Sequence, residues 1–84
     1  MVFYTYILRS QTTGKFYVGH SSNLEQRLVD HNRGHTVSLR GRGPWEIVYT
    51  EKFATKVEAV RRERLIKAMK NRRWIEELIQ SRHG

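Results

Sequence analysis

Residues 3–19, FYTYILRSQTTGKFYVG, contain two runs of aromatic and β-branched residues, at 3–8 and 16–19, with a polar segment between them. Such runs favour β-strands. Gly14, in the polar segment, can adopt a positive φ, so the two runs most simply form a β-hairpin. Because side chains alternate along a strand, Tyr4 and Tyr6 share a face, and the adjacent strand can set Tyr17 beside either of them. The sequence predicts a cluster of tyrosines on a small sheet.

A helix is predicted after the hairpin. Ser22 and Glu25 have the spacing of a capping box, and the helix that they open is expected to run to Gly34. Arg27 and His31 are four residues apart and are therefore neighbours on one polar face of this helix. Its short apolar stripe consists of Leu24, Leu28 and Val29.

The second half of the chain is expected to form one strand and two helices. Apolar residues at 45, 47 and 49 alternate with residues 46, 48 and 50, which predicts a third strand with one better-buried face. Thr55 and Glu58 form a second capping box, which opens a helix from about Lys56 to Met69. Asn71 is expected to cap a last helix. The apolar positions of that last helix are Trp74, Ile75, Leu78 and Ile79.

The helix at 56–69 mixes apolar and charged positions on one side. Its apolar arc consists of Val57, Val60, Leu65, Ala68 and Met69, and the same arc contains Arg61 and Arg64. Glu63 is one turn from Ala59 and Ile66, so its carboxylate is expected at an apolar edge, where it needs a counter-charge or a metal ion. The predicted order of elements is β-β-α-β-α-α.

Composition indicates one small globular domain. The chain has 84 residues, of which 38% are hydrophobic and 29% charged, so we expect a single domain over residues 1–84. It contains no cysteine, which excludes a disulfide scaffold and a cysteine zinc site. No apolar run approaches a membrane span, and the first ten residues lack the order of a signal peptide. We therefore expect an intracellular, cytoplasmic protein that does not contact a membrane and is a monomer or weak dimer.

Positive charge is concentrated toward the C-terminus. The net charge is +8, and residues 52–84 carry ten bases and four acids. Such a surface attracts polyanions, and nucleic acid, DNA above all, is the expected partner; the alternatives are a solvated surface without a partner and a membrane surface. The basic, glycine-containing segment at 35–44 could follow a phosphate backbone. The residues expected to bind nucleic acid are Arg40, Arg42, Arg61, Lys67, Lys70, Arg72 and Arg73.

Two short motifs and three single residues resemble a known family. TYI at 5–7 and YVG at 17–19 resemble the two half-motifs of the GIY-YIG nuclease superfamily, with Thr5 in place of glycine. Arg27 and His31 match the R-x-x-x-H spacing of many such nucleases, and Glu63 stands where the family keeps its metal-binding glutamate. The pieces YILRS, YVGHSSNLEQRLVDHNRG, the GRGPW segment before VYTEKF, and RRERLIK are similar to small single-domain bacterial members of the UPF0213 group.

The resemblance covers nearly the whole chain and implies an α+β fold, with a small three-stranded antiparallel sheet flanked by helices. Asn71 is the nearest counterpart of an asparagine that follows the glutamate in many members, although it lies closer to Glu63 than in repair nucleases. Homing and repair members attach a DNA-reading domain, and we expect none beside the single domain over residues 1–84. Sequence selectivity is therefore expected to be weak or supplied by a partner protein.

Phosphodiester hydrolysis needs an activated water, neutralised charge on the non-bridging oxygens and a protected 3′ oxygen. A glutamate on a rigid helix can hold one Mg²⁺ (or Mn²⁺), with waters completing an octahedron, and Glu63 is the candidate. Arg27 can pair with phosphate oxygens and stays charged. A tyrosine is a poor base at neutral pH unless nearby cations or a metal-linked water lower its pKa.

The resemblance implies that Tyr6 and Tyr17 share the activation of the water. Either can accept the proton; Tyr17 is favoured, with Tyr6 orienting it. His20 is expected to position or polarise the water, and His31 to hydrogen-bond a tyrosine or a phosphate. With Arg27 and Glu63, these residues form the predicted catalytic set.

Two functions from different classes remain. The first is a Mg²⁺-dependent endonuclease acting on branched, flapped or damaged DNA in repair or recombination, since shape can be recognised without base contacts. The second is a non-catalytic nucleic-acid-binding or adaptor module that keeps the fold and the basic surface. A nuclease directed at RNA is a third hypothesis. The chain retains every polar group of the predicted site except the late asparagine, which favours the enzyme.

Overall fold

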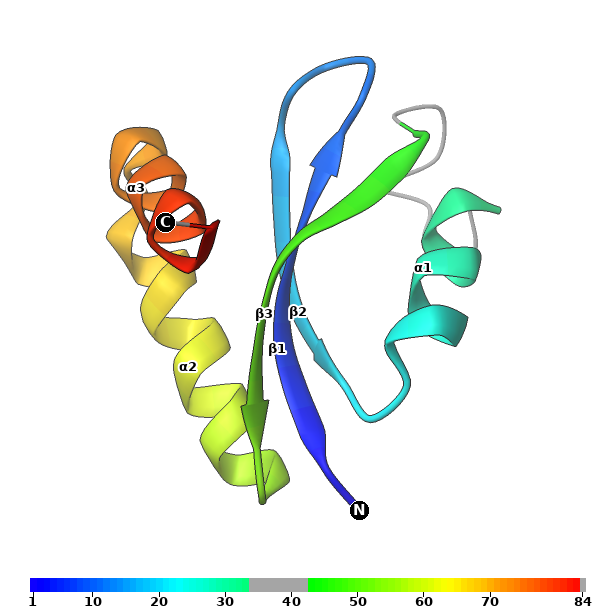
Figure 1. Ribbon diagram of the computed structural model, residues 1–84, viewed down its shortest axis with the longest axis vertical. Coiled ribbons are helices and arrows are strands. Elements are labelled where there is room, and N and C mark those ends of the chain that lie inside the picture. Colours follow the sequence, from blue (N-terminus) through cyan, green and yellow to red (C-terminus); the bar gives the residue numbers. More distant parts are fainter. Residues whose placement is uncertain (34–42, 84) are drawn as a thin grey trace.

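The computed structural model describes residues 1–33 and 43–83, and within them a small sheet lies between α1 on one face and α2 with α3 on the other (Figure 1). The strands are β1 (Phe3–Ser10), β2 (Phe16–Ser21) and β3 (Trp45–Phe53), and the helices are α1 (Leu24–Asn32), α2 (Lys56–Met69) and α3 (Arg72–His83). The strands pair antiparallel in the order β2-β1-β3. The predicted α+β fold and element order are confirmed. In the described part of the chain, no helix is long and apolar enough to cross a membrane.

The predicted hairpin forms between β1 and β2. Gly14 in its turn has a φ of +73°, which glycine adopts without steric cost. The register sets Tyr6 opposite Gly19 and Leu8 opposite Tyr17. Tyr6 and Tyr17 therefore share the face toward α1, and their ring centroids are 6.5 Å apart.

Each face of the sheet has its own apolar cluster. On the α1 face, the buried residues are Tyr6, Leu8 and Trp45, and Leu24 and Leu28 pack against them. On the opposite face, the buried residues are Ile7, Val18, Tyr49 and Ile66, and α3 packs against them through Trp74, Ile75, Leu78 and Ile79. The predicted apolar stripe of the last helix is confirmed.

A bulge in β3 overturns the prediction that residues 45, 47 and 49 share one face. Leu8 pairs with Ile47, but its neighbour Ile7 pairs with Tyr49, so Val48 is an extra residue in the ladder. Trp45 and Ile47 consequently pack on the α1 face, whereas Tyr49 packs on the α2 face.

The start of α1 also differs from the prediction. Asn23, not Ser22, is the N-cap, and its side-chain oxygen accepts a hydrogen bond from the Gln26 amide at 3.1 Å. The Ser21 hydroxyl bonds both the amide and the carbonyl of Asn23, at 3.0 Å each, and this local turn keeps residue 22 outside the helix. Val29 is exposed, so it does not belong to the apolar stripe. The predicted end at Gly34 lies outside the described residues.

The limits of α2 are as predicted, with Thr55 as its N-cap, but its predicted apolar arc is wrong. Ala59 and Ile66 are fully buried, while Val57, Leu65 and Met69 are 59%, 49% and 43% exposed. The buried Thr5 hydroxyl donates to the Ala59 carbonyl at 2.7 Å. This bond holds α2 against the central strand, β1, along the line of Ala59, Glu63 and Ile66. The predicted arc lies to the side of this line, so Val57, Leu65 and Met69 face solvent.

Candidate active site

A small pocket lies at the β2 edge of the sheet. It has a volume of about 180 Å³ and is lined by Tyr6, Tyr17, Gly19, His20, Arg27 and Glu63. These residues belong to β1, β2, α1 and α2, which are widely separated in the chain. The fold thus brings five residues of the predicted catalytic set to one pocket, and the sixth, His31, is hydrogen-bonded to Tyr6 behind them.

Glu63 points from α2 toward the pocket and is held at both carboxylate oxygens. Its Oε1 lies 2.6 Å from Nδ1 of His20, and its Oε2 accepts a hydrogen bond from the Lys67 ammonium at 2.7 Å. Burial acts to raise the pKa of Glu63, but the hydrogen bonds from Lys67 and His20 outweigh it and the pKa is lowered. Glu63 is therefore ionised at neutral pH. Of the two expected partners, a counter-charge or a metal ion, the structure shows the counter-charge in Lys67.

Tyr6 and His31 form a buried hydrogen-bonded pair. They are 2% and 3% exposed, and the Tyr6 hydroxyl lies 3.1 Å from Nε2 of His31. Burial, reinforced by Tyr17, raises the pKa of Tyr6 well above its ordinary value despite the opposing charge of Arg27. Burial and then Arg27 lower the pKa of His31, against the effect of Asp30. At neutral pH the phenol is protonated and the imidazole is neutral.

Tyr17 packs among aromatic rings and a lysine. Its ring meets His31 edge-on, at 4.8 Å between centroids and 61° between planes, and lies 6.4 Å from Trp45. The Lys67 ammonium lies 6.0 Å from the centroid of the Tyr17 ring. His31 therefore contacts both motif tyrosines, and positive charge lies beside Tyr17.

Gly19 is required by a close approach. A Cβ at this position would lie 2.6 Å from the Tyr6 hydroxyl oxygen and 2.8 Å from its Cζ. Real Cβ atoms essentially never come so close to another heavy atom. The glycine of YVG thus leaves space for the ring of Tyr6 to pass over β2 and reach the pocket.

Arg27 is an exposed cation of the site. It lines the pocket from α1, and within residues 1–33 and 43–83 it forms no ion pair. Its positive charge acts to lower the pKa of Tyr6 and the pKa of His31. An unpaired guanidinium facing a pocket suits an anion such as a phosphate.

The GIY-YIG catalytic domain family matches residues 2–76. The chain belongs to the GIY-YIG family. A UPF0213 protein of Oceanobacillus iheyensis is 43% identical over 67 residues, which are 79% of this chain and 77% of that protein. A UPF0213 protein of Natronomonas pharaonis is 39% identical over 67 residues, covering 79% and 78% of the two chains. The solution NMR structure of a UPF0213 protein from Bacillus halodurans matches with a TM-score of 0.62 and 35% identity, covering 100% of this chain and 88% of that one.

The donor set of this GIY-YIG domain fits a hard cation held by a single carboxylate. The described residues contain no group of three or more His, Asp or Glu side chains placed to hold a metal. Each carboxylate oxygen has two lone pairs, so the bonds from His20 and Lys67 leave Glu63 with acceptor capacity on both oxygens. Mg²⁺ is commonly bound by one or two carboxylates with several waters.

The predicted nucleic-acid-binding residues of the GIY-YIG domain separate into groups. Lys67, Lys70 and Arg72 line a groove beside the site. Arg61 lies elsewhere on α2, with Glu58, Arg62 and Leu65. Arg73 is 89% exposed at its side chain and pairs with Glu77 at 3.3 Å. Arg40 and Arg42 lie outside the described residues.

Two features of the site are not predicted by the sequence. One is the contact of His20 with Glu63, because the two residues are 43 positions apart; the ion pair of Glu63 with Lys67, four residues later, is expected from that spacing. The other is Lys15, which lines the groove from the hairpin turn. Asn71, the nearest counterpart of the family asparagine, accepts a hydrogen bond from the Trp74 amide at 3.1 Å, so it caps α3 as predicted.

Proposed function

We propose that this GIY-YIG domain is a divalent-metal-dependent endonuclease that hydrolyses phosphodiester bonds in DNA, with branched, flapped or damaged strands of repair or recombination as its substrates. The observation that carries the proposal is the convergence on one pocket of about 180 Å³ of two tyrosines, a glutamate held at both oxygens, and an arginine that forms no ion pair within residues 1–33 and 43–83. General bases, phosphate-binding cations and metal-binding carboxylates are the groups that this hydrolysis requires.

Glu63 is the metal ligand in this mechanism. When bound there, Mg²⁺ or Mn²⁺ supplies charge neutralisation on the phosphate and at the departing 3′ oxygen. His20 and Lys67 keep the carboxylate ionised and fix its orientation. His20 is thus a positioning residue for Glu63, a role that differs from the expected one of positioning or polarising the water.

Tyr17 accepts the proton of the attacking water. The pKa of Tyr6 is raised by burial and its hydroxyl is engaged with His31, so Tyr6 serves to orient rather than to take the proton. The Lys67 ammonium lies 6.0 Å from the centroid of the Tyr17 ring and Arg27 lines the same pocket, so positive charge lies beside the group that takes the proton. Arg27 also holds the phosphate through its non-bridging oxygens.

Glu63→Gln tests the proposal. The amide keeps the shape and some hydrogen bonding of the carboxylate but loses its charge, so cleavage of a branched DNA in Mg²⁺ should fall by about 10² or more while DNA binding persists. Glu77→Gln, which removes a carboxylate from an exposed ion pair on α3, is the matched control and should cleave like wild type. Thermal melting of both variants checks the fold.

Three results would contradict the proposal. Wild-type cleavage that survives EDTA would exclude the metal, and full activity of folded Glu63→Gln would exclude the site. DNA binding without cleavage in any variant, wild type included, would instead support the adaptor function.

A further inference from the structure

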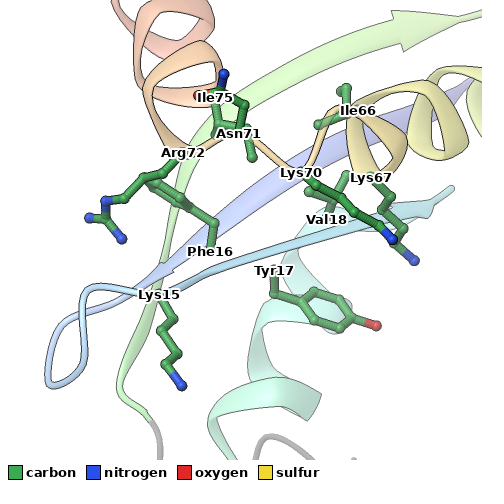
Figure 2. Close-up of a pocket in the computed structure, with 10 residues that line it drawn as sticks. All are labelled: Lys15, Phe16, Tyr17, Val18, Ile66, Lys67, Lys70, Asn71, Arg72 and Ile75. Carbon is green, nitrogen blue, oxygen red and sulfur yellow. The ribbon is translucent and has the colours of Figure 1, made fainter.

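A second, larger hollow adjoins the candidate active site. It has a volume of about 450 Å³, within the usual range for small-ligand sites. It lies between β2 and the junction of α2 with α3, and Tyr17 lines both hollows (Figure 2). A molecule bound in the catalytic pocket through Tyr17 would therefore extend directly into this groove.

The groove combines an apolar surface with cationic side chains. Phe16 and Ile75, both half-buried, contribute apolar atoms, and Lys15 and Lys70 also line the groove. The Arg72 guanidinium lies 4.8 Å from the centroid of the Phe16 ring, so a base would meet this arginine–aromatic pair. In Figure 2, Lys70 extends from the end of α2 toward Lys67, and Lys15 points away from Ile75, on the same side of β2 as Tyr17. Within the described residues the ammonium groups of Lys15 and Lys70 form no ion pair. A groove that binds only a phosphate backbone needs cations but gains nothing from exposed apolar atoms.

Lys70 carries an independent indication of function. It ends α2 in the left-handed region, at φ 46° and ψ 34°, where helices commonly place glycine. A side chain in this region costs on the order of 1 kcal/mol, and residues in strained conformations cluster at functional sites. At this position the ammonium of Lys70 lies on the groove.

We propose that the groove binds an unpaired nucleotide next to the phosphate that is cleaved, with its base on the apolar surface and its backbone at the lysines. In a duplex the base is stacked and paired, so its flat face is not available to such a surface, whereas in a single strand it is. The inference rests on the proposed nuclease function and narrows its substrates to strands that are unpaired beside the cleavage site.

Binding measured in EDTA tests this proposal without cleavage. The probes are a fluorescent single-stranded DNA, the same strand with its central bases removed to leave abasic sugars, and the matched duplex. Loss of the bases keeps the charge, so the abasic strand should bind about 10-fold or more weakly, the scale of base–aromatic stacking. The duplex has the higher charge density, so a purely electrostatic surface would bind it more tightly; the proposal requires the single strand to bind more tightly.

Two groove variants and one control locate the binding. Lys15→Ala and Lys70→Gly should each weaken single-strand binding and reduce its salt dependence by about one counterion. Lys52→Ala removes the same charge from β3, at the opposite edge of the sheet, and should match wild type. Binding of an RNA strand of the same sequence shows whether the groove prefers DNA or RNA, because only RNA offers a 2′-hydroxyl.

The outcomes separate this proposal from the nuclease function. Equal binding of intact and abasic strands, tighter binding of the duplex, or unchanged binding in both groove variants would overturn the groove assignment even if wild type cleaves DNA in Mg²⁺. Base-dependent binding that both groove variants weaken would support the assignment even if wild type fails to cleave.

Discussion

The ring of Tyr6 lies directly over Gly19, with its hydroxyl oxygen 2.6 Å and its Cζ 2.8 Å from where a Cβ of residue 19 would be. Tyr6 is 2% exposed and is hydrogen-bonded to His31, so it has no space into which to retreat. The glycine of the second motif and the tyrosine of the first are therefore sterically dependent on one another.

Gly19→Ala should consequently destabilise the protein by about 1–3 kcal/mol, the usual cost of overpacking, and reduce cleavage by displacing Tyr6. Denaturant unfolding and the cleavage rate measure the two effects. Adding Tyr6→Phe should restore part of the stability, because it removes the shorter contact but leaves Cζ. Ser22→Ala, at an exposed residue after β2, is the control. An alanine variant as stable and active as wild type would show that the strand adjusts freely.

Tyr17→Phe should lower the cleavage rate by about 10² or more while the fold persists, because only the proton-accepting hydroxyl is lost. Tyr6→Phe should have a comparable effect if the tyrosines act as a unit, and the double variant should then be little worse than either. Tyr4 lies on β1, the strand of Tyr6, but outside the pocket, so Tyr4→Phe should cleave like wild type. Circular dichroism checks all four proteins. Normal cleavage by folded Tyr17→Phe would make this tyrosine structural.

Protonation of His31 should destabilise the protein in mild acid. Its pKa is lowered in the folded state by burial and Arg27, so as the pH falls below about 6.5 the unfolded chain takes up this proton first. The free energy of unfolding should therefore decrease from pH 7 to pH 5, with a slope of at most about 1.4 kcal/mol per pH unit from this group. Above this range the imidazole is neutral in both states and contributes no slope.

His31→Gln isolates that contribution, because glutamine retains hydrogen-bonding capacity toward Tyr6 without titrating. Urea unfolding at several pH values should give a shallower dependence for the variant than for wild type. Parallel dependences would mean that another group governs the acid sensitivity.

Lys70→Gly should stabilise the protein by about 1 kcal/mol, because glycine adopts the left-handed region without the steric cost of a side chain. For a domain of this size the midpoint of thermal unfolding should rise by roughly 4–8 °C. Lys52→Gly, the same substitution in an extended strand, should instead be neutral or destabilising. A lower midpoint for Lys70→Gly would show that the lysine side chain stabilises the helix end.

Local signals in the sequence were sufficient to predict the secondary-structure elements and their order. Alternating aromatic residues and Gly14 predict the hairpin, and Thr55 predicts the start of α2, because these effects act over a few neighbouring residues. The half-motifs single out Tyr6 and Tyr17 in the same way. The element order therefore follows from residues that lie close together in the chain, whereas the resemblance to the family rests on motifs spread over nearly its whole length.

Tertiary packing alone decided which faces the elements present and how the site is held. The bulge that turns Tyr49 to the α2 face and the bond from Thr5 that selects the buried line of α2 are long-range contacts, which periodicity does not encode. The same holds for the contact of His20 with Glu63 across 43 residues. Register and helix rotation depend on how whole surfaces fit, so the sequence predicted the members of the candidate site and the packing of α2 against the sheet determined its geometry.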